Sequence, residues 1–546
     1  MALVATAASG LGACSSGDGT EQQQERSIAI GFFNQPDALD PALGQTIPAT
    51  SALSQVYTPL LAYRRVEGAH GTELIPGLAA ELPQVSSDGR TYTLRLREGL
   101  VYSDGTPGRA SDFEHALKRV LHLGSPGAPF YEHIAGAVDY EQTPDPDADL
   151  SGVETDDGSG RIVVRLDRPY APFEHLLALT FAAPVPAKTP FDDTTTDPPP
   201  ATGPFRITRS DPNREFVLER NPKFESLDID GIAPAKVDRI TVRIIPDKVK
   251  QAEDVLSNKL DYMSDSPSPD MLPTVRKQAG DRYEQHLLVS TNWFFMNGRL
   301  PPFDDLRVRQ AVNYGIDKSA LARVYAGQLQ PGCSFLPRGI TGYDEQLDKS
   351  GCPFGDPGKP PDVARARALI RAAGADGAKV TVWGYDQSPQ AEVVQAYAGM
   401  LDKLGLETKV RLVDFAVWRQ AIGNAKNKPQ TGLDSWTQAF PHPLTYFELV
   451  TSDAIRPTSN KNTSNIDDPV IDKAVRRLEG RRDSREVADD WSQLNRYLVE
   501  GAYIAPFGHR IRATFVSDRI DFRNCTFFHQ IYLEDWSHFC LKDGEE

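Results

Sequence analysis

The sequence lacks the features that would place it in a membrane or on a nucleic acid. Of its 546 residues, 75 are Asp or Glu and 59 are Lys or Arg, which gives a net charge of -16 at pH 7. Because proteins neutralise nucleic-acid phosphates with clustered Lys and Arg, this balance argues against a nucleic-acid partner. Beyond the N-terminus no apolar run is long enough to span a bilayer, so no transmembrane helix is expected. The length exceeds one hydrophobic core and favours two or three domains.

Catalytic signatures are missing as well. The sequence has no G-x-S-x-G, H-E-x-x-H or C-x-x-C motif and no phosphate-binding G-x-x-x-x-G-K-[ST] loop. Acidic residues are so numerous that chance carboxylate pairs are common, and no pair identifies a glycosidase. We therefore predict a protein that is not an enzyme and that uses no metal and no cofactor. An extracellular hydrolase is the alternative from a different functional class.

Cysteine is scarce, and one of the five stands apart near the N-terminus. Cys14 closes the sequence Leu-Gly-Ala-Cys, and a polar run without large apolar residues follows it. A small-residue cleavage site ending in Cys, followed by a flexible tether, resembles the lipobox of a bacterial lipoprotein, in which the thiol carries a lipid. The positively charged segment that normally begins such a signal is missing here. We expect residues 1–14 to be the signal segment, 15–26 the tether and Cys14 the lipidation site.

The other four cysteines form two pairs that are local in sequence. Disulfides are the default state in an extracellular setting, although four cysteines allow three pairings. We predict the bonds Cys333–Cys352 and Cys525–Cys540. The alternative is a zinc site, because His529 and His538 fall between the last two cysteines. Zinc ligands usually show tighter paired spacing than this.

Hydrophobic periodicity indicates an α/β chain. Alternating apolar residues predict strands at 91–97, 161–166 and 239–244. Ser111 opens a capping-box sequence, S-D-F-E, ahead of an amphipathic helix. Residues 379–413 predict a βαβ unit, whose helix follows Ser388-Pro389 and stops at Gly405.

Three segments rich in Pro, Gly, Asp and Thr are predicted to be loops without regular structure. They are residues 143–160, 189–204 and 351–361. The second contains three consecutive prolines and is interpreted as a crossing between lobes.

Several blocks of sequence occur in an order that resembles one protein family. The blocks are LDP at 39–41, VYTPLL at 56–61, LIPGLA at 74–79, SDGTP at 103–107, DF at 112–113, TGPF at 202–205, RNP at 220–222, and FMN, PFDDLRVRQA and IDK between 295 and 318. By these blocks the chain resembles the extracellular solute-binding proteins of peptide and nickel ABC transporters (family 5, cluster C). The resemblance covers nearly everything after the tether.

The resemblance implies a periplasmic-binding-protein-like type II fold. Two lobes joined by a hinge would close on a ligand, and an extra domain would enlarge the cleft. Lobe I would take residues 27–57, 185–286 and 513–546, the extra domain 58–184, and lobe II 287–512.

The resemblance also implies a function in capture without chemistry. A closed state favoured by ligand would dock on an ABC permease with its ATPase subunits. Peptides are the expected ligands, and an oligosaccharide or a metal chelate is the alternative. A sensor or adhesion protein on the same fold is a further alternative. We expect a monomer outside the cell membrane, anchored to its outer face by the lipid.

Candidate ligand-binding residues come from the same resemblance. Trp418 matches the position of a ligand-contacting Trp, with core packing as the alternative. Asp434 to Thr437 match a stretch whose backbone pairs with an extended peptide, an arrangement that binds without selecting side chains. The candidates are Trp418, Ser435, Trp436, Thr437, Ala439, Phe440, His509, Arg510 and Phe130, with Tyr131 as the alternative to Phe130.

Two of these candidates bear on specificity. Ala439 stands where peptide-binding relatives carry the Asp that pairs with the amino terminus of the peptide. A ligand ammonium would then need another partner, which places free dipeptides in doubt more than peptides generally. Arg510 stands near another cleft position, where a guanidinium can bind a carboxylate with two parallel hydrogen bonds. The alternative for Arg510 is an ordinary surface position.

Overall fold

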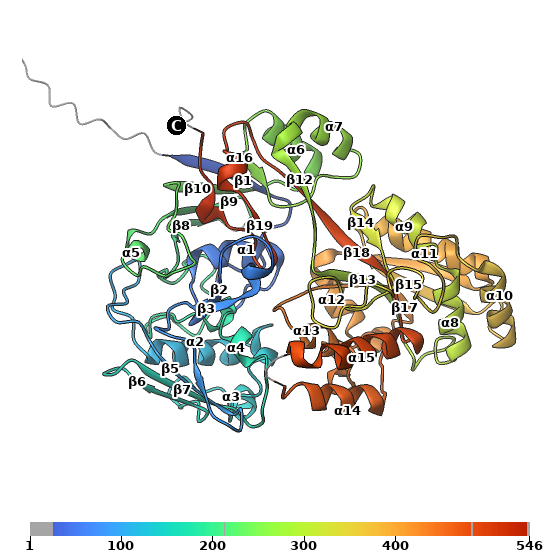
Figure 1. The fold of residues 1–546 in the computed structure, drawn as a ribbon, viewed down its shortest axis with the longest axis horizontal. Helices are drawn as coiled ribbons and strands as arrows, with labels where there is room; N and C mark the ends of the chain where they lie inside the picture. Colours follow the sequence, from blue (N-terminus) through green and yellow to red (C-terminus); the bar gives the residue numbers. More distant parts are fainter. Residues whose placement is uncertain (1–25, 212, 482–483, 543–546) are drawn as a thin grey trace, which may run out of the picture.

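The computed structural model describes residues 26–211, 213–481 and 484–542. The molecule has two halves that lie side by side, and each has a central sheet of its own (Figure 1). Among the described residues, no helix has both the length and the apolar character needed to cross a membrane. Cys14 lies outside these residues, so its lipidation stays a prediction.

The first half is built on a five-stranded sheet with the order β11-β1-β10-β9-β8. β1 runs parallel to both of its neighbours, while β9 is antiparallel to both β10 and β8. The predicted strand 239–244 is confirmed as β10. The strands are β1 (Ser27–Phe32), β8 (Phe205–Asp211), β9 (Glu215–Arg220), β10 (Arg239–Ile244) and β11 (Tyr262–Met263). The helices are α1 (Ile47–Val56), α5 (Pro222–Glu225), α6 (Lys248–Leu256), α7 (Leu272–Ala279) and α16 (Phe522–Cys525), and a small ribbon pairs β19 (Phe528–His529) with β20 (Leu533–Glu534).

A smaller antiparallel sheet with the order β4-β5-β7-β6 lies at the lower left of Figure 1. Its strands β5 and β7 confirm two predicted strands. β6 falls inside the segment 143–160, so the predicted loop is wrong there: Val153 is buried and pairs with Val164. The elements are β2 (Leu61–Tyr63), β3 (Leu74–Pro76), β4 (Gln84–Val85), β5 (Thr91–Arg95), β6 (Val153–Asp156), β7 (Arg161–Arg165), α2 (Ser111–His122), α3 (Ala137–Gln142) and α4 (Phe173–Leu176).

Helix α2 begins where it was predicted, but the capping box does not form. The residue before it makes no side-chain cap hydrogen bond. Instead Asp157 accepts hydrogen bonds from the Ser111 backbone at 2.8 Å and from its hydroxyl at 3.0 Å. Glu114, expected to complete the box, accepts from the backbone of Leu150 at 3.0 Å. A tertiary contact therefore supplies the cap.

The second half contains a seven-stranded sheet with the order β12-β18-β13-β17-β15-β16, and β14 also pairs with β18. The predicted βαβ unit is confirmed, because β15 and β16 are parallel and α11 lies between them and ends at Gly405 with φ 107°. The strands are β12 (Tyr283–Leu287), β13 (Ser290–Met296), β14 (Leu329–Pro331), β15 (Lys379–Tyr385), β16 (Glu407–Val413), β17 (Thr431–Thr437) and β18 (Ile504–Phe515). The helices are α8 (Leu306–Gly315), α9 (Lys318–Val324), α10 (Val363–Ala372), α11 (Gln390–Leu404), α12 (Phe415–Ile422), α13 (Leu444–Phe447), α14 (Pro469–Leu478) and α15 (Ala488–Glu500).

Two adjacent strand segments connect the halves near the top of Figure 1. β18 pairs with β13 through residues 504–508 and with β12 through residues 511–515. The next residue, Val516, bridges to Tyr262 in the sheet of the first half. The second crossing is the chain between β12 and β13. A pair of strands that continues from one half into the other provides a hinge.

Both predicted disulfides are present. The Cα atoms are 5.9 Å apart in Cys333–Cys352 and 5.5 Å apart in Cys525–Cys540. Nδ1 of His529 accepts two backbone N–H groups, and His538 is hydrogen-bonded to Asp535 at 2.8 Å. The alternative zinc site is wrong, because its cysteines are bonded to each other and its histidines have other partners.

Candidate ligand-binding site between the two halves

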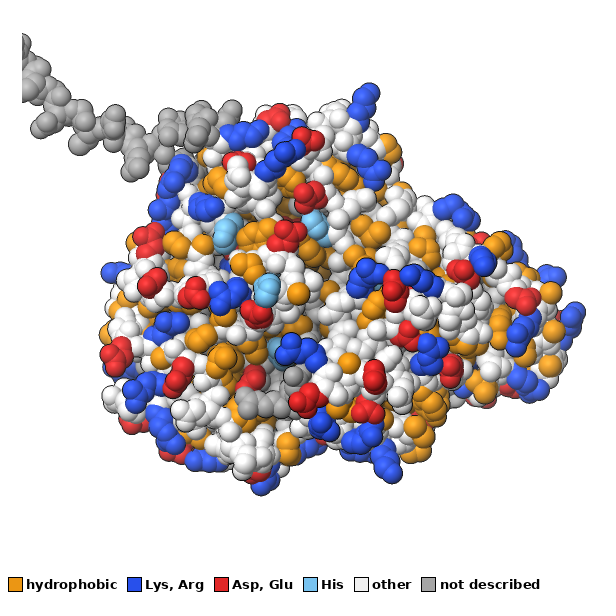
Figure 2. Space-filling view, in the orientation of Figure 1, with side chains coloured by type: hydrophobic (Ala, Val, Ile, Leu, Met, Phe, Trp, Pro, Cys, Tyr) orange, Lys and Arg blue, Asp and Glu red, His pale blue; other side chains and the backbone are white. Residues whose placement is uncertain are grey.

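The two halves touch along an interface that runs from the strand crossing down to α4 and α13 (Figure 1). In Figure 2, hydrophobic and histidine side chains are seen where the halves meet, among charged side chains of both signs that also cover the rest of this face. Four parts of the interface matter for function: a lower rim, an aromatic contact, an unpaired strand edge and an upper corner.

The lower rim joins the loop before α4 to α13 and α14. The Tyr170 hydroxyl donates a hydrogen bond to the carboxylate of Glu448, and the backbone N–H of Ala171 donates to the carbonyl of Glu479 at 2.8 Å. Arg168 lies 3.6 Å from the Glu479 carboxylate. Burial raises the pKa of Glu448, although the hydrogen bond from Tyr170 acts in the opposite direction. The rim is thus a polar contact made directly between the halves.

The aromatic contact lies next to the rim. Phe440 is fully buried, stacked 6.1 Å from the His175 ring and set edge-on 6.4 Å from Phe130. Nδ1 of His175 is 3.0 Å from the hydroxyl of Tyr63. Burial lowers the pKa of His175 to about 4, so the imidazole is neutral at pH 7. The stacked rings of Phe440 and His175 are uncharged, and the ammonium of Lys461 lies 5.5 Å from the ring centroid of Phe130.

The unpaired strand edge belongs to β17. β15 pairs with β17 only at Thr431 and Gly432, so from Leu433 onward this edge has no strand partner among the described residues. The opposite edge of β17 is paired with β13 through Thr437. Ser435, Trp436 and Thr437 are all partly exposed. An unpaired, partly exposed edge can accept an extended peptide as an added strand.

Arg419 of α12 lies against this edge. Its guanidinium pairs with Asp434 at 2.8 Å, donates to the carbonyl of Ser435 and lies 5.5 Å from the ring centroid of Trp436. Asp434 is buried, and burial raises its pKa while Arg419 and Thr463 act in the opposite direction. The side chain of Arg419 remains 44% exposed. Arg419 therefore occupies one carbonyl of the edge and presents a positive charge beside it.

The two tryptophans differ in their surroundings. Trp418 is only 4% exposed and packs 5.5 Å from the ring of Tyr385, which is the core packing that was the alternative to ligand contact. Trp436 is partly exposed, and its Nε1 donates to the hydroxyl of Thr445 at 3.3 Å. The same hydroxyl accepts from the backbone of Ala439 at 3.0 Å. Trp436 and Ala439 therefore lie together at the end of β17.

Of the remaining predicted residues, some lie in the aromatic contact and others are buried against other parts of the protein. Phe440 and Phe130 meet each other in the aromatic contact, and Tyr131 is buried with its hydroxyl donating to the carbonyl of Leu176 at 3.1 Å. His509 is also buried, with Nδ1 3.0 Å from the carbonyl of Ser290 and Nε2 3.1 Å from Asp348. No ring nitrogen of His509 is left for a ligand in this arrangement.

The upper corner is formed by Arg510 of β18 and Lys248 at the start of α6. The guanidinium carbon of Arg510 is 5.0 Å from the ring centroid of Tyr325, and its buried Nε has no hydrogen-bond partner. Nζ of Lys248 lies 4.6 Å from the ring centroid of Phe33 and 3.9 Å from the Asp265 carboxylate. Burial lowers the pKa of Lys248, the Asp265 carboxylate raises it, and the charges of Arg510 and Arg512 lower it. Each half thus contributes one partly buried cation to this corner.

Neither Lys248 nor Arg419 was predicted to belong to the site. Arg419 directly follows Trp418, so its position was signalled by the same stretch of sequence. Lys248 lies in a segment that has no distinguishing motif, so the sequence carried no signal for it.

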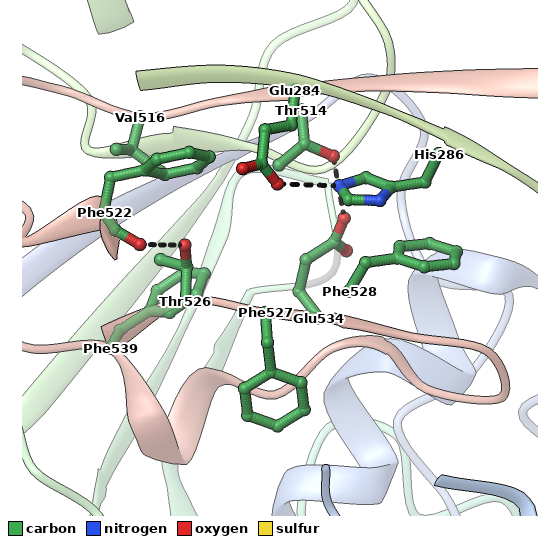
Figure 3. A pocket seen from close by; sticks show the side chains of 10 residues that line it. All are labelled: Glu284, His286, Thr514, Val516, Phe522, Thr526, Phe527, Phe528, Glu534 and Phe539. Carbon is green, nitrogen blue, oxygen red and sulfur yellow. Dashed lines mark hydrogen bonds and ion pairs between the residues drawn. The ribbon is translucent and has the colours of Figure 1, made fainter. Parts of the chain in front are cut away.

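A separate recess lies beside the strand crossing (Figure 3). It encloses about 290 Å³ of empty space open to solvent, lined by β12, β18 and the C-terminal segment. His286 stacks 4.5 Å from Phe528, with the Glu284 carboxylate 3.4 Å from its Nε2, and burial lowers its pKa. Glu534 is already paired with Arg512 at 2.9 Å. None of the predicted ligand-binding residues lines this recess.

Comparison with protein families gives one match that covers most of the chain. The model of bacterial extracellular solute-binding proteins, family 5 (middle region), matches residues 73–457. Among curated proteins, the chain is 22% identical to the oligopeptide-binding protein OppA of Bacillus subtilis over 527 residues, covering 92% of this chain and 91% of that protein. It is 25% identical to the dipeptide-binding protein of Escherichia coli over 453 residues, or 79% of each chain.

Solved structures show the same architecture. The clavulanic acid biosynthesis oligopeptide binding protein 2 superposes with a TM-score of 0.84 at 25% identity, covering 95% of this chain and 96% of that one. Haemophilus influenzae OppA in complex with the peptide RPPGFSPFR superposes with a TM-score of 0.76 at 20% identity, covering 95% and 99%. These likenesses confirm the predicted fold of two lobes with a hinge and an additional domain.

Proposed function

Because the chain belongs to family 5 of the bacterial extracellular solute-binding proteins, we propose that it captures peptides outside the cell membrane and delivers them to an ABC permease. The similar curated proteins are named for oligopeptide and dipeptide binding. Closure of the two halves around a peptide would then form the surface that the permease recognises. In this role the protein performs no chemical reaction.

The observation that carries this proposal is the unpaired edge of β17. Backbone hydrogen bonds along residues 433–437 would hold a peptide in extended form regardless of its side chains. Trp436 stands on this edge and would provide an aromatic wall for a ligand side chain. A peptide would have to share the edge with Arg419, or displace it from the carbonyl of Ser435.

We further propose the division into lobes that the sequence suggested. Lobe I would comprise residues 27–57, 185–286 and 513–546, the extra domain 58–184, and lobe II 287–512. This division is supported by the sheets, since β1 and β8–β11 lie in the first half and β13–β17 lie in the second. The ligand would lie between lobe II and the other two units, in contact with Ser435, Trp436 and Thr437.

The test is the identity of the compound that the protein carries. Protein purified without denaturation is to be unfolded in acid, and the released compounds are to be analysed by mass spectrometry. Peptides present in near-equimolar amount support the proposal, and calorimetry with a synthetic copy then measures affinity. Recovery of an oligosaccharide or a metal chelate instead would assign a different solute to the same receptor fold.

We also propose that Cys14 anchors the protein to the outer face of the membrane, where it works as a monomer. The support is the lipobox-like sequence and the polar tether that follows it. Each buried CH₂ of an acyl chain contributes about 0.8 kcal/mol, so several chains would give lasting attachment. With a complete signal sequence upstream, Cys14→Ser is expected to release the protein to the medium, whereas membrane retention of this variant contradicts the anchor.

A further inference from the structure

We propose that the ion pair of Arg419 and Asp434 occupies the middle of the open edge of β17, and that it limits the ligand to short peptides whose backbone pairs with Thr437 alone. The inference rests on the proposed function and narrows it, because it states where along the edge a peptide binds and what sets its length. Two side chains of the protein would then take the place that a longer peptide needs.

The pairing with β13 shows which backbone groups of β17 face the open edge. The N–H of Gln438, directly after β17, donates to the carbonyl of Val289, directly before β13, at 3.0 Å. The register between the two strands continues from there without a bulge. Because residues that bond to the partner strand alternate with residues that do not, the even-numbered residues of β17 face β13. The odd-numbered residues Leu433, Ser435 and Thr437 therefore present their N–H and C=O groups to the open edge.

At Ser435 both of these backbone groups already have a partner within the protein. The N–H of Ser435 donates to Oδ1 of Asp434 at 2.8 Å, and its carbonyl accepts from Nη2 of Arg419. Nη1 of the same guanidinium lies 2.8 Å from Oδ1 of Asp434, and the hydroxyl of Thr463 donates to Oδ2 at 2.8 Å. The ion pair thus offers Ser435 one acceptor and one donor, as a residue of an added strand would.

The charge of Asp434 keeps Arg419 in this place. Asp434 is buried, so removal of the guanidinium would leave a buried carboxylate without a cation, which is strongly unfavourable. The backbone N–H of a peptide is neutral and does not replace that positive charge. A peptide backbone therefore pairs beside the Arg419–Asp434 pair rather than in its place.

The positions on either side of Ser435 differ in access. Leu433 is 1% exposed and follows Gly432, the last residue of β17 that pairs with β15. Thr437 is partly exposed, and among the described residues no group outside β13 is hydrogen-bonded to it. Of the three edge positions, Thr437 is therefore the one that is open to a ligand backbone, and the partly exposed Trp436 directly precedes it.

Beyond Thr437, contacts between the halves close the path. Nε2 of Gln438 donates to the carbonyl of Gln530 at 3.0 Å, and Phe440 stacks on His175. Oε1 of Gln438 is buried and has no hydrogen-bond partner among the described residues, so it can accept from a ligand N–H. A peptide residue that pairs with Thr437 thus has the ion pair on one side and the closed interface on the other. With one neighbour on each side of that residue, the ligand is a tripeptide.

Retention of peptides by length tests the limit. A pool of random dipeptides to hexapeptides, equimolar for each length, is added to the protein, and the peptides retained after dialysis are quantified by mass spectrometry. The wild-type protein is expected to retain dipeptides and tripeptides about tenfold or more over pentapeptides and hexapeptides. Equal retention of all lengths overturns the proposal.

A double variant tests whether the ion pair sets the limit. Arg419→Ala with Asp434→Asn removes both charges together, so no buried charge is left unpaired, and it frees the carbonyl of Ser435. This variant is expected to retain pentapeptides and hexapeptides about threefold or more better than the wild type, the gain for a further backbone hydrogen bond. Arg299→Ala with Asp467→Asn is the matched control, because it removes an exposed pair of the same half whose atoms lie 2.9 Å apart. An unchanged length distribution in the first variant, or an equal shift in the control, overturns the proposal.

Hydrogen exchange separates this inference from the peptide proposal, because it needs no ligand. After correction for intrinsic rates, the N–H of Ser435, which is bonded to Asp434, should exchange about tenfold or more slower than the N–H of Thr437, which faces the open edge. If no peptide is retained but this difference is found, the peptide function fails and the occupied edge stands. Equal exchange at the two residues overturns the inference, whatever the protein binds.

Discussion

The aromatic contact and the upper corner are two parts of one interface with opposite character. In the aromatic contact, Phe440 lies against the neutral ring of His175 and against Phe130, and the ammonium of Lys461 lies 5.5 Å from the Phe130 ring centroid. In the upper corner each half contributes a cation, Lys248 or Arg510, and the buried Nε of Arg510 has no hydrogen-bond partner. The first contact is made by side chains of the protein alone, whereas the second leaves one buried donor without a partner.

This difference indicates how a receptor distinguishes loaded from empty. If all contacts between the halves were satisfied internally, the closed state would form without a ligand and would carry no signal. If none were, a ligand would have to supply the whole free energy of closure. When only some of the contacts between the halves are satisfied internally, the bound ligand decides whether the closed state is the more stable one.

The largest expected effect comes from breaking the neutral contact. Phe440→Ala removes a fully buried ring and is expected to cost about 3 kcal/mol of the free energy that holds the closed state, as for other large-to-small buried changes. Small-angle scattering of the variant should show a more extended molecule. Phe440→Leu, which keeps most of the apolar volume, is the control. An unchanged scattering profile for Phe440→Ala would contradict this role for the aromatic contact.

The second largest effect, a loss of ligand affinity, is expected at the unpaired edge of β17, between the aromatic contact and the upper corner. Trp436→Ala is expected to weaken binding of the recovered ligand by about 2 kcal/mol, the range for an aromatic anchor, without unfolding the protein. Isothermal titration calorimetry measures the loss, and circular dichroism checks the fold. Trp436→Phe, which keeps an aromatic face, should lose less. Unchanged affinity in Trp436→Ala would move the ligand away from this edge.

Acidification should place a positive charge in the aromatic contact, because it protonates His175. His175 has a pKa of about 4 in the structure, below its ordinary value of 6.5, so its contribution to stability is fully present above pH 6.5 and is lost as the pH falls to about 4. Denaturant titrations across this range should show a decline that is smaller in His175→Gln. The raised pKa of Glu448 works in the opposite sense, because its contribution is lost as the pH rises. Identical slopes in wild type and His175→Gln would refute the assignment.

The smallest effect is expected at the exposed part of the lower rim. Arg168 is 50% exposed and lies 3.6 Å from Glu479, a geometry in which an ion pair contributes less than about 1 kcal/mol. Arg168→Gln should leave the scattering profile and ligand affinity nearly unchanged, and high salt should abolish what difference remains. A large opening of the molecule in this variant would show that the rim, rather than the aromatic contact, holds the halves together.

Local features of the chain could be predicted from the sequence. The βαβ unit follows from alternation in its strands and from Gly405, whose positive φ suits the end of a helix. The disulfides Cys333–Cys352 and Cys525–Cys540 join cysteines 19 and 15 positions apart, so the local pairing was the natural choice. The order of sequence blocks identified the family. Each of these signals lies within a short stretch or a recognisable motif.

Long-range features could not be predicted in the same way. The cap of α2 comes from Asp157, and β6 forms because β7 offers a partner for Val153, neither of which periodicity reveals. The same holds in the candidate site. Trp418 packs in the core, and both ring nitrogens of His509 are hydrogen-bonded, to Ser290 and to Asp348. Lys248 lies against Phe33, which is far from it in the sequence. Which face of an element a residue occupies depended on partners far away in the chain.

The continuous strand β18 has a consequence for how a bound ligand would leave. Arg510 lies on this strand, close to the pivot, whereas Phe440 and Glu448 lie just before and just after α13, at the opposite end of the interface (Figure 1). For a given angle of rotation, groups far from a pivot travel farther than groups beside it. Opening would therefore separate the rim and the aromatic contact first and widen the corner last. A ligand would then be released from the rim end first, so the distance of each contact from the pivot sets the order in which the contacts break.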